Sequence, residues 1–162
     1  MIFTNSFKYE DIISKIDKEK DSITIVGCNG CVRTSGAGGP EKMKELALKL
    51  RNDGYNVLDG YMLPAACVEP YIHKAKLSFD VNTVIALSCS AGFFNMKNNF
   101  SHVKVVESVE DIGLFVADAN TEIIKVVMPY EKHKDKLGEE YIMGTDGKDK
   151  LVEKQIAMDL EV

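Results

Sequence analysis

Short β-branched runs alternate with segments of helical period through the first half of the chain, and this alternation restricts the possible folds. The runs are residues 22–27, 56–63 and 83–88. Such side chains favour strands. After the first run, Met43, Leu46 and Leu50 recur at helical spacing, with Pro40 suited to the first turn. Helices between consecutive strands imply right-handed crossovers, so we predict an α/β fold, a three-layer sandwich with a mainly parallel sheet.

Further elements are expected before and after these strands. The apolar spacing of residues 7–16 predicts an opening helix within residues 6–18. A further helix is expected over residues 68–79, where one helical face is shared by Val68, Tyr71, Ile72, Ala75 and Phe79. Beyond Cys89 we expect a strand at 103–106 and a hairpin of 113–117 with 123–128. A last helix is expected at 148–158. Charge and glycine in residues 134–147 indicate a mobile connection.

Composition favours one domain over residues 1–162, since 162 residues with 45% hydrophobic content can build one core. No stretch approaches the roughly 20 apolar residues of a membrane span, and the first 22 residues are too charged for a signal peptide. We therefore expect a cytoplasmic protein without membrane contact. A net charge of -5, with lysines interleaved among acids, also argues against binding nucleic acid.

All four cysteines, Cys28, Cys31, Cys67 and Cys89, follow the three predicted strands. The carboxyl ends of parallel strands meet at one edge of a sheet, where sites of α/β proteins form. In the cytosol, cysteines are more often metal ligands or catalytic groups than disulfides. The sequence therefore predicts a metal site at this edge, with all four cysteines as ligands.

The Cys28-Asn29-Gly30-Cys31 turn can direct two sulfurs toward one metal, and four thiolates suit a [4Fe-4S] cluster or a structural zinc. Two other interpretations remain open. Cys28 and Cys31 could form a thiol-disulfide oxidoreductase centre. Alternatively, Cys67 and Cys89 could each be an ordinary buried side chain, because free cysteine is among the most buried residue types.

A small-residue loop, Ser35-Gly36-Ala37-Gly38-Gly39-Pro40, opens the strongest helix. It lacks the lysine of a Walker loop, so we expect it to wrap a metal centre, with an anion-binding module as the alternative. Of the three histidines, His73 lies on a predicted helix and His133 in a lysine-rich segment, so we expect both at the surface; nothing near His102 completes a catalytic triad. Phe93 and Phe94, just after Cys89, are placed to shield a cluster from water.

Several segments together resemble the methylenetetrahydrofolate reductase C-terminal domain family, the small cysteine-rich subunit that accompanies methylenetetrahydrofolate reductase in anaerobic bacteria. The resemblance covers about residues 6–95 and depends on the order of the cysteine groups. It is carried by residues 7–16, Gly27-Cys28 with Cys31, Gly38-Gly39, Pro64-Ala65-Ala66-Cys67 and Ala86-Leu87-Ser88-Cys89-Ser90-Ala91-Gly92.

The resemblance implies an accessory or electron-transfer protein of anaerobic one-carbon metabolism. We expect a non-catalytic or electron-relay subunit of an oxidoreductase in preference to an independent enzyme. Its implied partner is a flavin-dependent methylenetetrahydrofolate reductase or a related redox subunit. Cys28, Cys31, Cys67 and Cys89 would hold one centre, a [4Fe-4S] cluster in preference to zinc. Ser35 stands where family members commonly carry another cysteine, and none follows Cys89, so the chain has thiols for a single centre.

Overall fold

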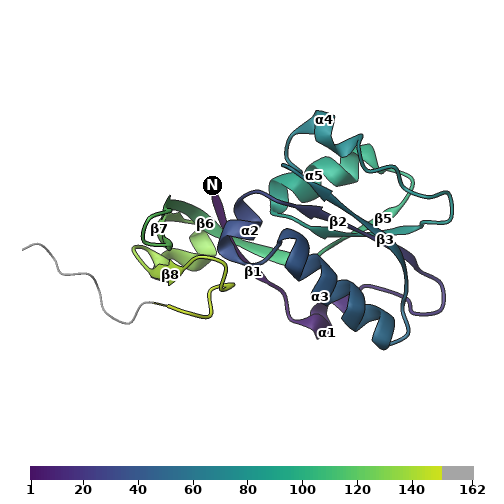
Figure 1. Ribbon diagram of the computed structural model, residues 1–162, viewed down its shortest axis with the longest axis horizontal. Helices are drawn as coiled ribbons and strands as arrows, with labels where there is room; N and C mark the ends of the chain where they lie inside the picture. Colours follow the sequence, from purple (N-terminus) through teal and green to yellow (C-terminus); the bar gives the residue numbers. More distant parts are fainter. Residues whose placement is uncertain (151–162) are drawn as a thin grey trace, which may run out of the picture.

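Two four-stranded sheets form the core of residues 1–150, the part of the chain that the computed structural model describes (Figure 1). The parallel sheet has the order β3-β2-β4-β5. Its strands are β2 (Ser22–Cys28), β3 (Asn56–Leu63), β4 (Thr83–Leu87) and β5 (Lys104–Glu107). The antiparallel sheet has the order β1-β6-β7-β8. Its strands are β1 (Ile2–Ser6), β6 (Val109–Asp118), β7 (Ile123–Pro129) and β8 (Glu140–Ile142).

The predicted three-layer sandwich with a mainly parallel sheet is wrong, because half of the described strands belong to the second, curled antiparallel sheet. Ser108 alone separates β5 from β6, so the chain leaves the parallel sheet without a crossover helix. β6 instead pairs with β1, the start of the chain. Register shifts at Phe3/Thr4 and Leu114/Phe115 mark irregularities that accompany the curl.

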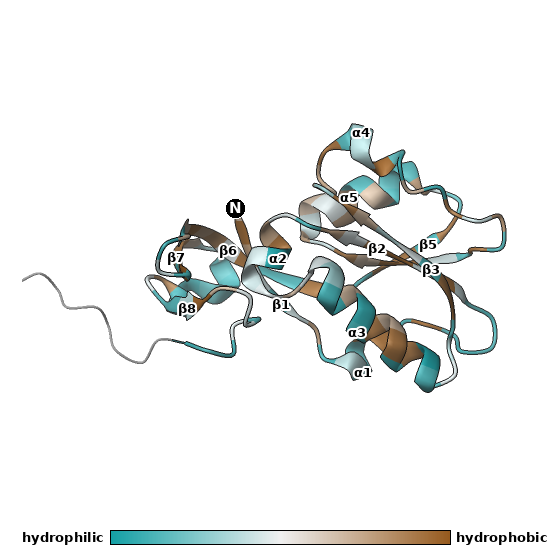
Figure 2. Cartoon of the chain, viewed as in Figure 1, coloured by the Kyte–Doolittle hydropathy of each residue, from teal (hydrophilic) through white to brown (hydrophobic). Residues whose placement is uncertain are grey.

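Within the parallel part, the helices follow the expected crossover pattern. Figure 1 shows α3 (Gly39–Asn52) and α5 (Ser90–Asn99) on opposite sides of the sheet, with α4 (Glu69–Ile72) beside α5. Ile23 and Ile25 of β2 pack on the α3 side, and Val26 packs on the α5 side. Figure 2 shows hydrophobic brown colouring along β2 and mixed teal and brown in α3, as expected for a strand buried on both faces and a helix buried on one. The strand order reverses between β2 and β4, because β2 connects to β3 and β4 connects to β5.

The three strands expected before Cys89, the helix after Pro40 and the β6–β7 hairpin are confirmed. The opening helix is wrong in extent: β1 occupies Ile2–Ser6, and α1 spans only Tyr9–Ile13. The helix expected over 68–79 is reduced to α4, and Phe79 is fully exposed.

The later segments differ from expectation in part. Residues 134–147, expected as a mobile connection, include the end of the 3-10 helix η1 (Glu131–Lys136) and the strand β8. Of the helix expected at 148–158, all but the first three residues lie outside the described part of the chain. No helix in residues 1–150 is long and apolar enough to cross a membrane.

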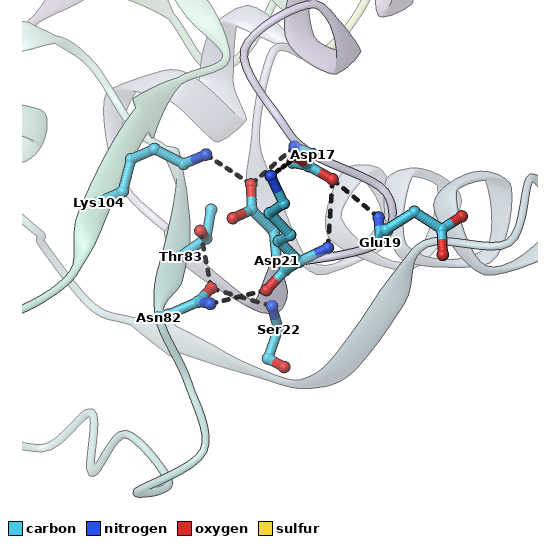
Figure 3. Close-up of polar contacts among 8 residues, drawn as sticks. Asp17, Glu19, Asp21, Ser22, Asn82, Thr83 and Lys104 are labelled. Carbon is cyan, nitrogen blue, oxygen red and sulfur yellow. Dashed lines mark hydrogen bonds and ion pairs between the residues drawn. The ribbon is translucent and has the colours of Figure 1, made fainter.

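A polar network ties the turn before β2 to the amino ends of β4 and β5 (Figure 3). The Asp21 carboxylate accepts hydrogen bonds from Lys104 Nζ and, at 2.8 Å, from the Asp17 N–H. Asn82 accepts from the Ser22 N–H at 2.9 Å and donates to the Lys20 carbonyl at 2.8 Å. Burial alone would raise the pKa of Asp21, but the Lys104 ion pair and the backbone bond outweigh it and lower that pKa.

This network predicts an acid-sensitive contribution to stability. A carboxyl with a depressed pKa stabilises the fold above its unfolded pKa, and the contribution is lost as pH falls through the folded value. We expect Asp21→Asn to lower the free energy of unfolding at pH 7 by about 1 kcal/mol, since Lys104 is partly exposed. The difference in free energy of unfolding between the unmodified protein and Asp21→Asn should become smaller below about pH 4. Urea unfolding at pH 7 and pH 3 checks this, with the exposed Asp80→Asn as control; equal effects of both variants would contradict it.

Candidate functional site

Three adjacent parallel strands bring the cysteines to one edge. Cys28 is the last residue of β2 and lies opposite Leu63, the last residue of β3. Cys67 follows in the turn after β3, and Cys89 caps the amino end of α5 just after β4. Cys31 begins the short helix α2 (Cys31–Ser35). The site therefore lies at the carboxyl edge, beside the point where the strand order reverses.

The four thiols are free and differ in exposure. Cys28 and Cys89 are each only 3% exposed. Cys31 is half-buried and Cys67 is exposed. The group of four cysteine side chains therefore extends from the apolar core to the surface, and Cys67 is its most exposed member.

Backbone N–H groups act on the three inner sulfurs. Cys28 Sγ accepts hydrogen bonds from the Gly30 and Ala66 N–H groups, each at 3.4 Å. The backbone N–H groups of Ile2 and Val32 help to lower the pKa of Cys31, and the Gly92 N–H opposes the rise in the pKa of Cys89. Gly92 allows the Ala66 turn to approach, because a Cβ there would lie 2.9 Å from the Ala66 methyl. Donors fixed in this way favour sulfur in its anionic form.

Cys31 and Cys89 form a sulfur pair. The hydrogen bond from Cys89 lowers the pKa of Cys31 to about 6, against the opposing effect of burial. The same bond, together with burial, raises the pKa of Cys89. Burial raises the pKa of Cys28, and negative charge on Cys31 or Cys67 raises it further. These effects link the thiols in sequence: Cys31 interacts with both Cys28 and Cys89, and Cys67 interacts with Cys28.

The antiparallel sheet completes the surroundings of the thiols. The amino group of Met1 helps to lower the pKa of Cys31, and Cys31 packs against the cores of both sheets. Asp111 of β6 accepts from the Ser90 N–H at 3.1 Å and raises the pKa of Cys89. Burial raises the pKa of Tyr130, and the charges of Asp111, Cys89 and Cys31 raise it further.

These neighbours were not predicted from the sequence. The predicted opening helix overlapped the end of β1, and no sequence pattern indicated that β6 lies beside α5. The run Ile2-Phe3-Thr4 carried a usable strand signal, since it combines β-branched and aromatic residues. No local pattern marks Asp111 or Tyr130.

The small-residue loop that begins at Ser35 makes close contacts with the backbone of another segment. Gly36 ends α2 at a φ of +92°, and a Cβ there would lie 2.3 Å from the Gly144 backbone. The carbonyls of Thr34 and Ser35 accept hydrogen bonds from the N–H groups of Gly144 and Asp146, each at 2.8 Å. The loop therefore holds the segment after β8, and the closest contacts of its glycines are not with cysteines.

The remaining candidates lie apart from the thiols or contribute no ligand. His73 and His102 are exposed, and His133 Nε2 lies 3.2 Å from Glu110 Oε1. Phe93 packs on the core that contains Cys28 and Cys89, whereas Phe94 is 66% exposed. Ser35 is buried and its hydroxyl bonds to that of Thr4 at 2.8 Å, so it ties α2 to β1.

Within residues 1–150, no three or more His, Cys, Asp or Glu side chains are arranged as ligands of a single metal ion. Comparison with family models finds no match. Comparison with curated proteins and with solved structures also finds none.

Proposed function

We propose that Cys28, Cys31, Cys67 and Cys89 hold one [4Fe-4S] cluster, with zinc as the alternative metal, and that the protein acts as an accessory or electron-transfer protein. The observation that carries this proposal is the convergence of the thiols on one sheet edge, where Cys28 Sγ accepts two backbone N–H hydrogen bonds. Hydrogen bonds to thiolate sulfur are one means by which proteins stabilise and tune such clusters.

The residues fit a metal centre in their chemistry. Buried thiolates need positive charge nearby, and the cation that influences Cys31 is the Met1 amino group. A metal centre would supply the missing positive charge, and a cluster would add one-electron transfer. The sulfurs would have to draw closer as the group binds, and Cys67, on an exposed turn, is the least constrained of them.

The exposure of Cys67 supports an electron-transfer role over a purely structural one. A closed structural site has no need of a solvent-facing ligand, whereas electrons must enter and leave a cluster near the surface. The order of the cysteine groups resembles the family named above, which is the reason for preferring iron-sulfur to zinc. It is also the basis for proposing a flavin-dependent methylenetetrahydrofolate reductase or related redox subunit in anaerobic one-carbon metabolism as the partner.

Metal analysis of protein purified without oxygen tests this function. We expect brown protein that contains iron and sulfide and absorbs broadly in the blue. Colourless protein with stoichiometric zinc would support the four-thiolate centre but contradict the electron-transfer role. Protein without either metal, after growth with both supplied, would overturn the proposal.

The Cys31–Cys89 pair favours a second candidate, a thiol-disulfide centre, and it differs from the Cys28–Cys31 pair expected from the sequence. The Cys89 thiol lowers the pKa of Cys31, and Cys31 raises that of Cys89, so Cys31 is the thiolate of the pair. Oxidation would join them in a disulfide. The Cys31 thiolate and the Cys89 thiol would give up two electrons and one proton to an oxidant such as a substrate disulfide, which takes its second proton from solvent as it becomes two thiols.

The pKa of Cys31 makes this pair testable in metal-free, reduced protein. Thiolate is the reactive form, so alkylation of Cys31 by iodoacetamide should reach half its maximal rate near pH 6. Cys89→Ala removes the hydrogen bond and should move this midpoint upward by more than one pH unit, whereas Cys28→Ala should leave it nearly unchanged. Mass spectrometry of the alkylated peptides identifies the residue. An unchanged midpoint in Cys89→Ala would contradict the pairing.

A further inference from the structure

A cavity of about 470 Å³ opens between α3 and the segment that joins β1 to α1. It reaches the carboxyl edge of the parallel sheet, since Leu87 ends β4 and Ser108 follows β5. Ligands of α/β proteins bind at this edge, and the volume lies within the range of roughly 300–1,000 Å³ for small-molecule sites. The cavity has no cysteine in its lining, so it is distinct from the thiol cluster.

Apolar side chains form much of the cavity wall. Phe7 and Ile12 contribute from the first segment, and Leu46 contributes from α3. All three belong to, or pack against, the buried cluster on the α3 side of the sheet. This wall suits the carbon body of an organic molecule better than a small inorganic ion.

The charged part of the lining is predominantly basic. It consists of Lys8, Lys42, Lys49, Lys148, Glu45 and Asp146. Lys42 pairs with both acids, at 3.6 Å to Glu45 and 3.8 Å to Asp146. The other three lysines form no ion pair with a carboxylate of residues 1–150. In a chain of net charge -5, this local excess of lysine selects for an anion.

Ser6 ties one wall of the cavity to the segment after β8. Its backbone N–H donates to Asp146 Oδ1 at 2.7 Å, and both residues line the cavity. The Ser6 Oγ atom is closed off from solvent, so the hydroxyl itself does not face the cavity.

We propose that this cavity binds a small organic anion, with its apolar body against Phe7, Ile12 and Leu46. Its carboxylate, sulfonate or phosphate group is attracted by Lys8, Lys49 and Lys148, the lining lysines that form no ion pair within residues 1–150. The site stands independently of any metal at the cysteines.

A fluorescence titration of the full chain with 8-anilinonaphthalene-1-sulfonate tests the site, because this probe combines an aromatic body with an anionic group. We expect saturable binding at one site, weakened by added salt. Amide chemical shifts should change in residues 6–12, 42–49 and 146–148. Shifts confined to any other surface, or no saturable binding, would overturn the proposal.

Three variants sharpen the test. Lys49→Glu and Lys148→Glu should each weaken probe binding about three- to tenfold, the size expected for charges near the surface. Lys44→Glu makes the same charge change at an exposed site on α3 outside the cavity, and it should change binding less than about twofold. If Lys44→Glu weakened probe binding as much as the two cavity variants, the effect would come from net charge alone, and this would contradict the proposed site.

Discussion

Protein purified without oxygen should lose its iron when any one of Cys28, Cys31, Cys67 or Cys89 is replaced by serine. A serine hydroxyl is a far weaker ligand than a thiolate for iron-sulfur clusters and for zinc. Because the four thiols suffice for only one centre, the loss should approach completeness in every variant. Iron and sulfide analysis, with the visible absorption spectrum, measures it.

Ser88→Ala is a matched control for these variants. Ser88 is buried beside Cys89, and its hydroxyl bonds only to the Cys89 carbonyl among the described residues. It should retain the metal. Retention of metal in Cys67→Ser and Cys89→Ser would contradict the four-cysteine centre. Disulfide formation that survives Cys28→Ser and Cys67→Ser but not Cys31→Ser would instead favour the thiol-disulfide candidate.

Gly36→Ala should lower the free energy of unfolding by about 3–5 kcal/mol. The positive φ alone costs a side chain roughly 1–2 kcal/mol. In addition, the new Cβ would lie 2.3 Å from the Gly144 backbone and 2.5 Å from the Asp146 N atom. That segment must move away, which breaks its two hydrogen bonds to Thr34 and Ser35, each worth about 1 kcal/mol.

Gly138→Ala isolates the effect of this close approach. Gly138 also has a positive φ, +78°, but a Cβ there meets no atom within 4 Å. It should cost only the conformational part, about 1 kcal/mol. Urea unfolding of both variants measures the difference, and equal losses would show that the loop does not hold the segment after β8.

The sequence predicted those parts of the fold that local pattern controls. The strands β2, β3 and β4 are β-branched runs, and α3 has a clear helical period with Pro40 in its first turn. Their alternation requires parallel pairing, so the three strand ends that carry Cys28, Cys67 and Cys89 could be predicted to share one edge.

Pairing between distant segments could not be predicted in this way. β1 pairs with β6, with Ile2 opposite Leu114, and no local pattern specifies that register. Antiparallel register depends on which faces become buried once both strands meet. The same pairing, with the chain leaving the parallel sheet at Ser108, produced the second sheet that the predicted sandwich lacked.

The sequence by itself determined that four thiols follow three parallel strands, because alternating strands and helices leave few ways to connect them. Only the tertiary structure decided which thiols influence each other: it coupled the pKa of Cys31 to that of Cys89, and it brought Ile2, Asp111 and Tyr130 near enough to act on or respond to them. The physical reason is that a pKa near 6 at Cys31 arises from groups on both sheets. Such contacts exist only after chain segments remote in sequence have packed together.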